Sequence, residues 1–221
     1  MKNKHLIYGG LAGLGLLLLW PKGPLYAVIN RNLPPPSPKP VGPGGVSGLS
    51  HSQASSIVHQ AWVKVHGREP TESERNYAQA IALLETGYGR IGQFAQMAAR
   101  GKYNWGAIQA RPNADGSCPV NYEPGIDQGN VCFRVFPSDI DAAAEFIKQL
   151  TLPYGPATFQ QRRQGTLNAM NGGSPEDVAR AMRTPTSVAY YAGPAGTEEQ
   201  KVAYYANAIR SNLNRISPGL V

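Results

Sequence analysis

The sequence predicts a mainly α-helical domain with a small β or loop insertion, preceded by an apolar N-terminal segment and a Pro/Gly-rich linker. Three observations predict this organisation. Helix-start and helix-end signals recur from about residue 50 to the C-terminus, a loop-rich stretch interrupts them at residues 102–136, and no βαβ alternation or long internal repeat occurs. A chain of 221 residues is long enough for one modest domain and a less folded portion.

Residues 1–29 are predicted to form a membrane anchor. An uncharged apolar run at residues 6–20 follows Lys2 and Lys4. This run is shorter than the roughly 20 residues that a membrane-spanning helix needs, so a removed signal peptide is the alternative. We favour the anchor, because Leu25 occupies the first small position of the best cleavage site. The two lysines would stay in the cytoplasm, with the remainder of the chain outside.

Residues 30–49 are predicted to be a tether. They are rich in Pro at first and in Gly afterwards, and they contain too few large apolar residues to form a core. A Pro-rich spacer is extended and semi-rigid, and a Gly-rich one is flexible. The alternative is a proline motif that binds a partner. Residues 50–221 then form the folded domain.

The folded domain is predicted to begin with three helices. Apolar residues lie on one helical face at residues 57–65, and Gly67 ends this first helix. Thr71 caps the second helix, with a Glu three residues later, and Gly87 ends it. Residues 93–100 form a short third candidate.

Four more helices are predicted after the loop-rich stretch. Ser138 caps a helix that extends to residue 150, and residues 158–171 form a weaker candidate. Ser174 opens the next helix, with Pro at its first position and acids in its first turn. Thr197 opens the last helix. The inward face of that helix carries Val202, Tyr205, Ala206, Ile209 and Leu213.

The insertion at residues 102–136 contains both cysteines and a short alternation of apolar residues at 131–135, where a small sheet is expected. We predict a disulfide between Cys118 and Cys132, because the anchor places them on the oxidising side of the membrane. Closing so short a loop contributes about 3 kcal/mol. The alternative, a zinc pair, lacks further ligands, since no His follows position 66.

Charge and motifs exclude several function classes. The net charge of +7 belongs to residues 1–68, which contain seven basic residues and no acid, whereas residues 69–221 contain fourteen of each sign. The folded domain has no basic stripe, so nucleic acid is not an expected partner. The absence of a late His and of Gly-x-Ser-x-Gly argues against a hydrolase triad. No Gly-rich nucleotide motif occurs, and we expect neither cofactor nor metal.

Glu85 is the strongest candidate for chemistry. It stands four residues after Ile81 and eight after Tyr77, so it continues an inward apolar stripe to the point where Gly87 breaks the helix. A partly desolvated carboxyl has a raised pKa, which suits a general acid that works near neutral pH. The alternative is a Glu that turns to solvent or pairs with Arg90.

Two later segments extend this pattern. Residues 103–109 read Tyr-Asn-Trp-Gly-Ala-Ile-Gln, and residues 190–193 read Tyr-Tyr-Ala-Gly. With Glu85, they resemble the lysozyme-like superfamily of peptidoglycan glycosidases, in particular soluble-lytic-transglycosylase-like and glucosaminidase-like domains. The first segment is one residue tighter than the family form Asn-x-x-Gly-x-x-Gln, and Tyr88 begins the stretch that replaces the usual Ser. The resemblance covers about residues 52–215.

The resemblance implies a lysozyme-like α-helical domain in which Glu85 is catalytic and peptidoglycan glycan strands are the substrate. It implies that residues 104–109, called the Asn-to-Gln segment below, form one wall of the sugar cleft. It also implies that a late Tyr pair, residues 190–191, reaches back toward Glu85. Aromatic rings would stack on sugars and amides would bind N-acetyl and hydroxyl groups. Core packing is the alternative for the aromatic residues. The implied substrate-binding residues are Tyr103, Asn104, Trp105, Gln109, Tyr190 and Tyr191.

Glycosidases normally use two carboxyls, and the sequence offers one convincing candidate. Asp115, Glu123, Asp127 and Asp139 are the candidates for a second, of which Asp127 is the best. A lone Glu is what a lytic transglycosylase resemblance implies: the enzyme cleaves between N-acetylmuramic acid and N-acetylglucosamine and leaves a 1,6-anhydro end, and Tyr191 would hydrogen-bond the Glu or the sugar. The alternatives are a water-using muramidase or glucosaminidase, and a non-catalytic wall-binding or virion structural protein.

The expected location follows from the anchor. The catalytic domain would lie outside the cytoplasm, in the cell envelope or in a virion membrane, or it would be secreted if the N-terminal segment is cleaved. A tethered enzyme of this size suits local opening of the cell wall by a phage or by a bacterial envelope assembly. Other envelope or virion proteins would then be partners.

Overall fold

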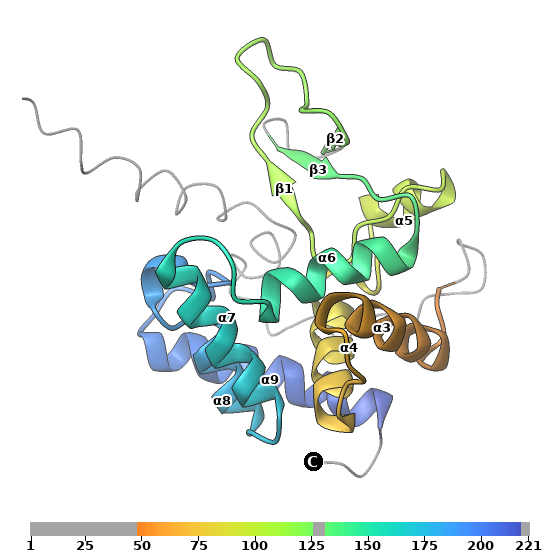
Figure 1. The fold of residues 1–221 in the computed structure, drawn as a ribbon. Coiled ribbons are helices and arrows are strands. Elements are labelled where there is room, and N and C mark those ends of the chain that lie inside the picture. The colour runs from red at the N-terminus through yellow and green to blue at the C-terminus, as the bar shows by residue number, and fades with distance from the viewer. Residues whose placement is uncertain (1–47, 126–130, 218–221) are drawn as a thin grey trace, which may run out of the picture.

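A computed structural model describes residues 48–125 and 131–217. The chain is mainly α-helical in these residues (Figure 1). The predicted anchor at residues 1–29 and nearly all of the linker at 30–49 lie outside them. None of the described helices combines the length and the apolar character that crossing a membrane requires. The helices are α3 (His51–His66), α4 (Glu72–Thr86), α5 (Gln93–Ala99), α6 (Asp139–Thr151), α7 (Ala157–Met170), α8 (Pro175–Ala181) and α9 (Glu198–Ile216), and a 3₁₀ turn, η1, spans Thr186–Val188.

The helix boundaries follow local capping chemistry. Thr71, Ser174 and Thr197 each accept a hydrogen bond from the backbone three residues later and form complete capping boxes, as expected from the sequence. The first helix begins earlier than predicted, because Ser50 forms a capping box with Gln53. Every predicted helix is confirmed, with ends that differ by a few residues at most apart from this one.

The insertion contains a small antiparallel sheet. Its strands are β1 (Gln109–Ala110), β2 (Tyr122–Pro124) and β3 (Cys132–Arg134), in the order β1-β3-β2. In Figure 1 the sheet and its long loop extend away from the helices. The disulfide between Cys118 and Cys132 is confirmed and ties the loop to the central strand.

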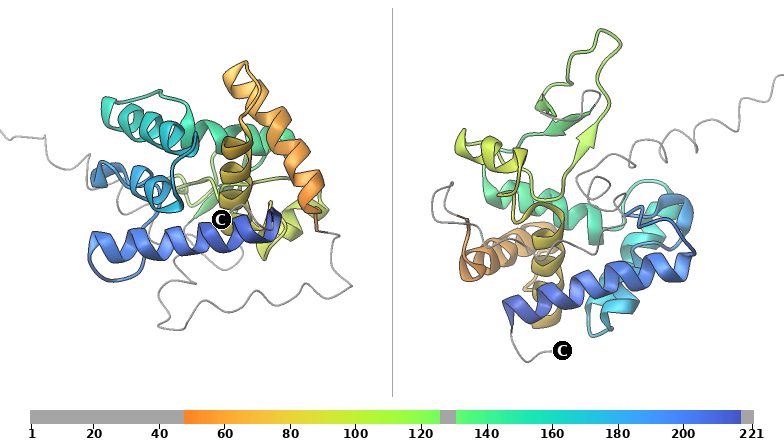
Figure 2. Two further views of the ribbon diagram at one scale, coloured as in Figure 1. Left: turned by 90° about the horizontal axis from the view of Figure 1, so that it is seen from below. Right: turned by 180° about the vertical axis from the view of Figure 1, so that it is seen from behind.

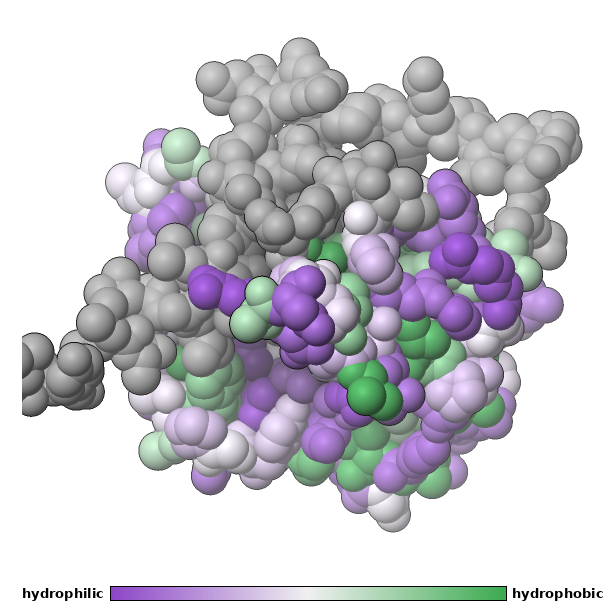
Figure 3. Space-filling view, turned by 90° about the horizontal axis from the view of Figure 1, so that it is seen from above, coloured by the Kyte–Doolittle hydropathy of each residue, from purple (hydrophilic) through white to green (hydrophobic). Residues whose placement is uncertain are grey.

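The helices enclose one main core. Helix α3 packs against α4 and α6, and α9 packs against α4 and α8, so α4 contacts helices on both sides (Figure 2). A second small cluster joins α5 to β3 through Phe94 and Phe133. On the coloured part of the face in Figure 3, apolar residues lie in small groups between hydrophilic ones. The largest buried side chains of the main core include Trp62, Ile81, Trp105, Phe146, Leu150, Tyr191 and Tyr205.

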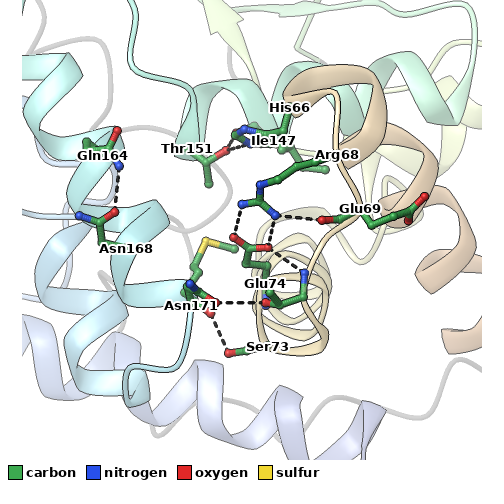
Figure 4. A network of polar contacts seen from close by, with 12 residues as sticks. His66, Arg68, Glu69, Ser73, Glu74, Ile147, Thr151, Gln164, Asn168 and Asn171 are labelled. Atoms are coloured by element: carbon green, nitrogen blue, oxygen red, sulfur yellow. Dashed lines mark hydrogen bonds and ion pairs between the residues drawn. The ribbon is translucent and has the colours of Figure 1, made fainter.

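The N-terminal end of α4 is fixed by an ion pair between the exposed Arg68 and the buried Glu74 (Figure 4). The Arg68 guanidinium donates to both carboxylate oxygens of Glu74, which also accepts from the Thr71 backbone N–H. Burial acts to raise the pKa of Glu74, but the hydrogen bonds from Arg68 and Thr71 outweigh burial and hold it below its ordinary value. Because this end of the helix is anchored, the position of Glu85 at the other end is well defined.

Candidate active site

Glu85 lies at the C-terminal end of α4 and is buried. Only 7% of its surface is exposed, as the inward stripe of the helix predicts. Desolvation raises the pKa of Glu85 to about 8, against the opposing effect of a hydrogen bond from Tyr205. Most of the carboxyl population is therefore protonated at neutral pH. A buried, protonated carboxyl is suited to general acid chemistry.

One oxygen of Glu85 accepts a hydrogen bond from the last helix. The Tyr205 hydroxyl, on α9, donates to Glu85 Oε1 at 2.5 Å. Among the described residues nothing donates a hydrogen bond to Oε2. The Tyr205 ring stacks on that of Tyr191, with ring centroids 3.8 Å apart and planes within 7°. This stack fixes the direction of the hydroxyl, and thus the orientation of the carboxyl.

The late Tyr pair is close to Glu85, but Tyr191 does not have the expected partner. Its hydroxyl donates to the Ala179 carbonyl, and its ring supports Tyr205. The contact predicted for Tyr191 is therefore made by Tyr205. Burial raises the pKa of Tyr190, and the charge of Glu85 raises it further, so Tyr190 lies near the carboxyl. The sequence placed Tyr205 on the inward face of the last helix. That position was the only sequence signal that Tyr205 could contact Glu85.

The turn after α4 has an unusual backbone. Gly87, Tyr88 and Gly89 all have positive φ, and Tyr88 at φ 59° is not a residue that prefers this region. The Tyr88 ring packs on Trp105, and its hydroxyl lies 3.0 Å from His51 Nδ1. These contacts hold the strained residue beside Glu85.

The Asn-to-Gln segment lies against this turn, where the resemblance places the cleft wall. Thr86 Oγ1 donates to the Trp105 carbonyl at 2.7 Å and accepts from the Gly89 N–H. A Cβ at Gly89 would lie 3.1 Å from the Asn104 carbonyl oxygen, so only Gly allows this approach. Segments about twenty residues apart in the sequence are thereby joined next to the candidate acid.

The side chains of Asn104 and Trp105 point into the protein and stabilise this segment. The sequence predicted that they would contact the substrate. Asn104 donates to the Ile108 and Arg134 carbonyls and accepts from the Ile108 N–H, so its side-chain amide closes the turn. Trp105 has no exposed surface, and its indole N–H donates to Asp139. Neither side chain presents a surface on which a sugar could bind, and we correct both assignments to structural support. For Trp105, core packing was the alternative interpretation.

Gln109 and Tyr103 are better placed for a ligand. Gln109 lies on β1 and is half-buried, and its Oε1 has no hydrogen-bond partner among the described residues. Tyr103 is also half-buried and lies 5.2 Å from the Arg90 guanidinium, measured to the ring centroid. Both side chains keep some exposed surface, unlike Asn104 and Trp105, and an amide and an aromatic ring are groups that bind sugars.

Arg90 does not pair with Glu85, so that alternative is not observed. Its guanidinium instead forms an ion pair with Asp139, with the closest N···O distance at 2.8 Å. Asp139 Oδ1 also accepts from Trp105. Asp139 therefore anchors the turn and the wall segment to the start of α6, and both of its oxygens are engaged.

The other candidates for a second carboxylate are also engaged or lie outside the described residues. Asp115 accepts from the backbone and hydroxyl of Ser117, and Glu123 forms ion pairs with Arg100 and Lys102. Asp127 lies outside the described residues. In residues 48–125 and 131–217, no three His, Cys, Asp or Glu side chains lie close enough together to bind a metal ion.

A hollow of about 610 Å³ lies at the other end of α4. Of the α4 residues that border it, Tyr77 is nearest to Glu85 in sequence, eight positions or about 12 Å along the helix axis. The hollow is therefore distinct from the candidate site. It is lined by Glu72, Ser73, Asn76, Tyr77, Gly172, Gly173, Ser174, Pro175 and Leu213.

No family model matches the chain, and neither a curated protein nor a solved structure matches it.

Proposed function

We propose that this chain is a peptidoglycan glycosidase with a lysozyme-like domain, and specifically a lytic transglycosylase that cleaves the β-1,4 bond between N-acetylmuramic acid and N-acetylglucosamine. The observation that carries the proposal is the state of Glu85: buried at a helix end, with a pKa raised to about 8, and held through one oxygen by Tyr205. The position of the Asn-to-Gln segment beside it supports the same assignment.

In the proposed reaction Glu85 acts first as an acid and then as a base. The protonated carboxyl gives its proton to the glycosidic oxygen, and the bond from that oxygen to C1 of the muramic residue breaks. The carboxylate then takes the proton of the muramic C6 hydroxyl while O6 bonds to C1. The 1,6-anhydro ring closes, Glu85 is protonated again, and no water is consumed.

Two features favour a single-carboxyl mechanism over a hydrolase with two. Asp115, Glu123 and Asp139 are each engaged by other protein groups. No described residue is shown donating to Glu85 Oε2, and we assign this oxygen to the proton transfer in both steps. Tyr205 holds the carboxyl, and we assign Gln109 and Tyr103 to substrate binding.

The proposed location is the outer side of a membrane, with the domain tethered by the N-terminal segment. The disulfide fits an oxidising compartment, and the linker would give the domain some reach. Such an enzyme would act on the wall close to its own membrane, in a bacterial envelope or at the surface of a virion.

The test is the mass of the muropeptides that the full chain releases from purified sacculi, next to its Glu85→Gln variant. We expect anhydro ends from the wild type. We expect a loss of about a hundredfold or more in the variant, because general acid catalysis contributes roughly that factor or more. The variant should keep the far-UV circular dichroism of the wild type, since Gln has the shape of Glu.

Other outcomes would change the assignment. Reducing ends would indicate a muramidase or glucosaminidase and a second carboxylate. Retention of a tenth of the activity by Glu85→Gln would remove Glu85 from the mechanism. Sacculus binding without release by the wild type would indicate a wall-binding protein.

A further inference from the structure

Two adjacent arginines on α7 are both buried but are bonded very differently. Each exposes only 4% of its surface. Arg163 donates from Nε and Nη2 to the Gln149 carbonyl and side-chain oxygens, and from Nη1 to the Tyr154 carbonyl. All three of its nitrogens have acceptors. Arg163 therefore clamps α7 to the end of α6 and the loop that follows it.

Arg162 has only one such bond. Its Nη2 donates to the Gln149 carbonyl at 2.9 Å, whereas its Nε is buried without an acceptor. No carboxylate of the described residues lies within ion-pair distance of Arg162. Desolvation, together with the charge of Arg163, lowers the pKa of Arg162 to about 10, so it still carries its charge at neutral pH. Buried charges in proteins are normally paired, and no carboxylate of the described residues pairs with this one.

The unpaired guanidinium lies close to the candidate active site. Its Cζ is 5.4 Å from the Tyr190 ring centroid and 5.7 Å from that of Phe159. Tyr190 lies near both groups, since the charge of Glu85 raises its pKa and that of Arg162 lowers it. A single tyrosine thus connects the positive charge and the acid, although they come from different helices.

We propose that Arg162 binds a carboxylate of the glycan substrate next to Glu85. This inference rests on the proposed function. A planar guanidinium whose Nη1 has no acceptor among the described residues matches a carboxylate, and the bond is stronger in a desolvated site than in water. The substrate has two sources of this group: the lactyl carboxylate of N-acetylmuramic acid when no peptide is attached, and the carboxylates of the stem peptide when one is. Arg162 thereby selects muramic residues in the subsite beside the acid.

A purely structural role predicts a different behaviour. Arg162 also contacts aromatic rings, and cation–π contacts contribute to packing. If that were its only role, its removal would weaken all ligands alike. A role in packing alone would not make the protein bind a carboxylate ligand more tightly than its neutral amide. This preference is therefore the quantity to measure.

The experiment is calorimetric binding to the full chain carrying Glu85→Gln, which prevents turnover. The ligands are soluble tetrasaccharide fragments of peptidoglycan: one with stem peptides, one without peptides, and a version of each with its carboxylates converted to amides. For a fragment whose carboxylate binds Arg162, we expect the amidated form to bind about tenfold to a hundredfold more weakly than the acid form.

Adding Arg162→Met should remove that preference, and Arg162→Lys should keep part of it. Arg163→Met is the matched control: it should lower thermal stability but leave the preference unchanged. A preference confined to the peptide-bearing fragment assigns the stem peptide, and one confined to the bare glycan assigns the lactyl group. Equal binding of acid and amide forms, or no binding of either, would overturn the inference.

This design separates the two proposals. If the wild type releases no muropeptides but the carboxylate preference is present and depends on Arg162, the subsite stands and the catalytic assignment fails. If cleavage occurs and Arg162→Met cleaves acid and amidated glycans with an unchanged ratio of kcat/KM, the catalytic assignment stands and the subsite fails.

Discussion

The helical core around α4 and the insertion around β3 are stabilised in different ways. The core buries large side chains such as Trp62, Phe146 and Tyr205 without exposed surface. The insertion has short strands, and its stabilising contacts are the small apolar cluster around Phe133, the disulfide and the ion pairs of Glu123, while Val120 is 87% exposed. A segment with little apolar surface to bury needs covalent and polar contacts instead.

This difference explains where the acid is located. A carboxyl keeps its proton at neutral pH only in a desolvated environment, which the core provides at Glu85. On the insertion, hydrogen bonds from Ser117 lower the pKa of Asp115, and Glu123 forms ion pairs with Arg100 and Lys102. In the candidate active site, the acid Glu85 therefore belongs to the helical core, and the Asn-to-Gln segment lies where the core meets the insertion.

The largest effect is expected from Phe146→Ala. Phe146 is fully buried on α6 and packs against the Asn-to-Gln segment. A Cβ added at Gly106 would lie 2.7 Å from the Phe146 ring. Truncation should lower the free energy of unfolding by about 3–5 kcal/mol in denaturant titrations. Val120→Ala, on the insertion, is the control and should change it by less than about 0.5 kcal/mol. A loss below about 1 kcal/mol for Phe146→Ala would show that the core is not the main source of stability.

Removal of the disulfide should act locally. The double variant Cys118→Ser, Cys132→Ser should destabilise the insertion by about 3 kcal/mol, because the open loop gains entropy when unfolded. Hydrogen exchange should accelerate at strand amides such as Arg134, which donates to the Ile108 carbonyl, and remain slow in α4 and α9. Equal acceleration in the helices would mean that the two regions unfold as one unit.

Glu85 should make stability depend on pH. Its pKa is raised in the folded state, so the stabilisation is complete below about pH 4.5 and is lost as the pH rises toward about 8. Over this window the wild-type free energy of unfolding should fall by about 1.4 kcal/mol per pH unit relative to Glu85→Gln.

The comparison with Glu85→Gln is needed because other groups titrate in the same window. Burial lowers the pKa values of His51 and His66, which gives stability the opposite slope with pH in both proteins. Chemical denaturation at several pH values measures the difference. Parallel curves for the two proteins would show that Glu85 is not desolvated.

The smallest effect is expected from Tyr205→Phe. The lost hydrogen bond favours the charged form of Glu85, so the pKa of the acid should rise further. The alkaline limb of the kcat/KM profile should move to higher pH, with a stability loss of about 1 kcal/mol. Tyr204→Phe, one residue away, should leave the profile in place. A shift to lower pH would contradict the assigned hydrogen bond.

The sequence by itself determined the helices and the inward position of the acid. The caps at Thr71, Ser174 and Thr197 act within a single turn, and the stripe from Tyr77 to Glu85 lies on a single helix. Such signals depend only on neighbouring residues, so they can be read without knowing the fold. The disulfide was predictable because both cysteines lie in one short loop.

Only the tertiary structure decided which residues meet. Tyr205 donates a hydrogen bond to Glu85, 120 positions away in the sequence. Tyr191, which was predicted to make this contact, stacks on the Tyr205 ring instead. Trp105 donates inward to Asp139, and none of the described acids pairs with Arg162. Periodicity indicates which side of a helix faces the core, but the partner on that side depends on how distant helices pack, and no local pattern encodes their packing.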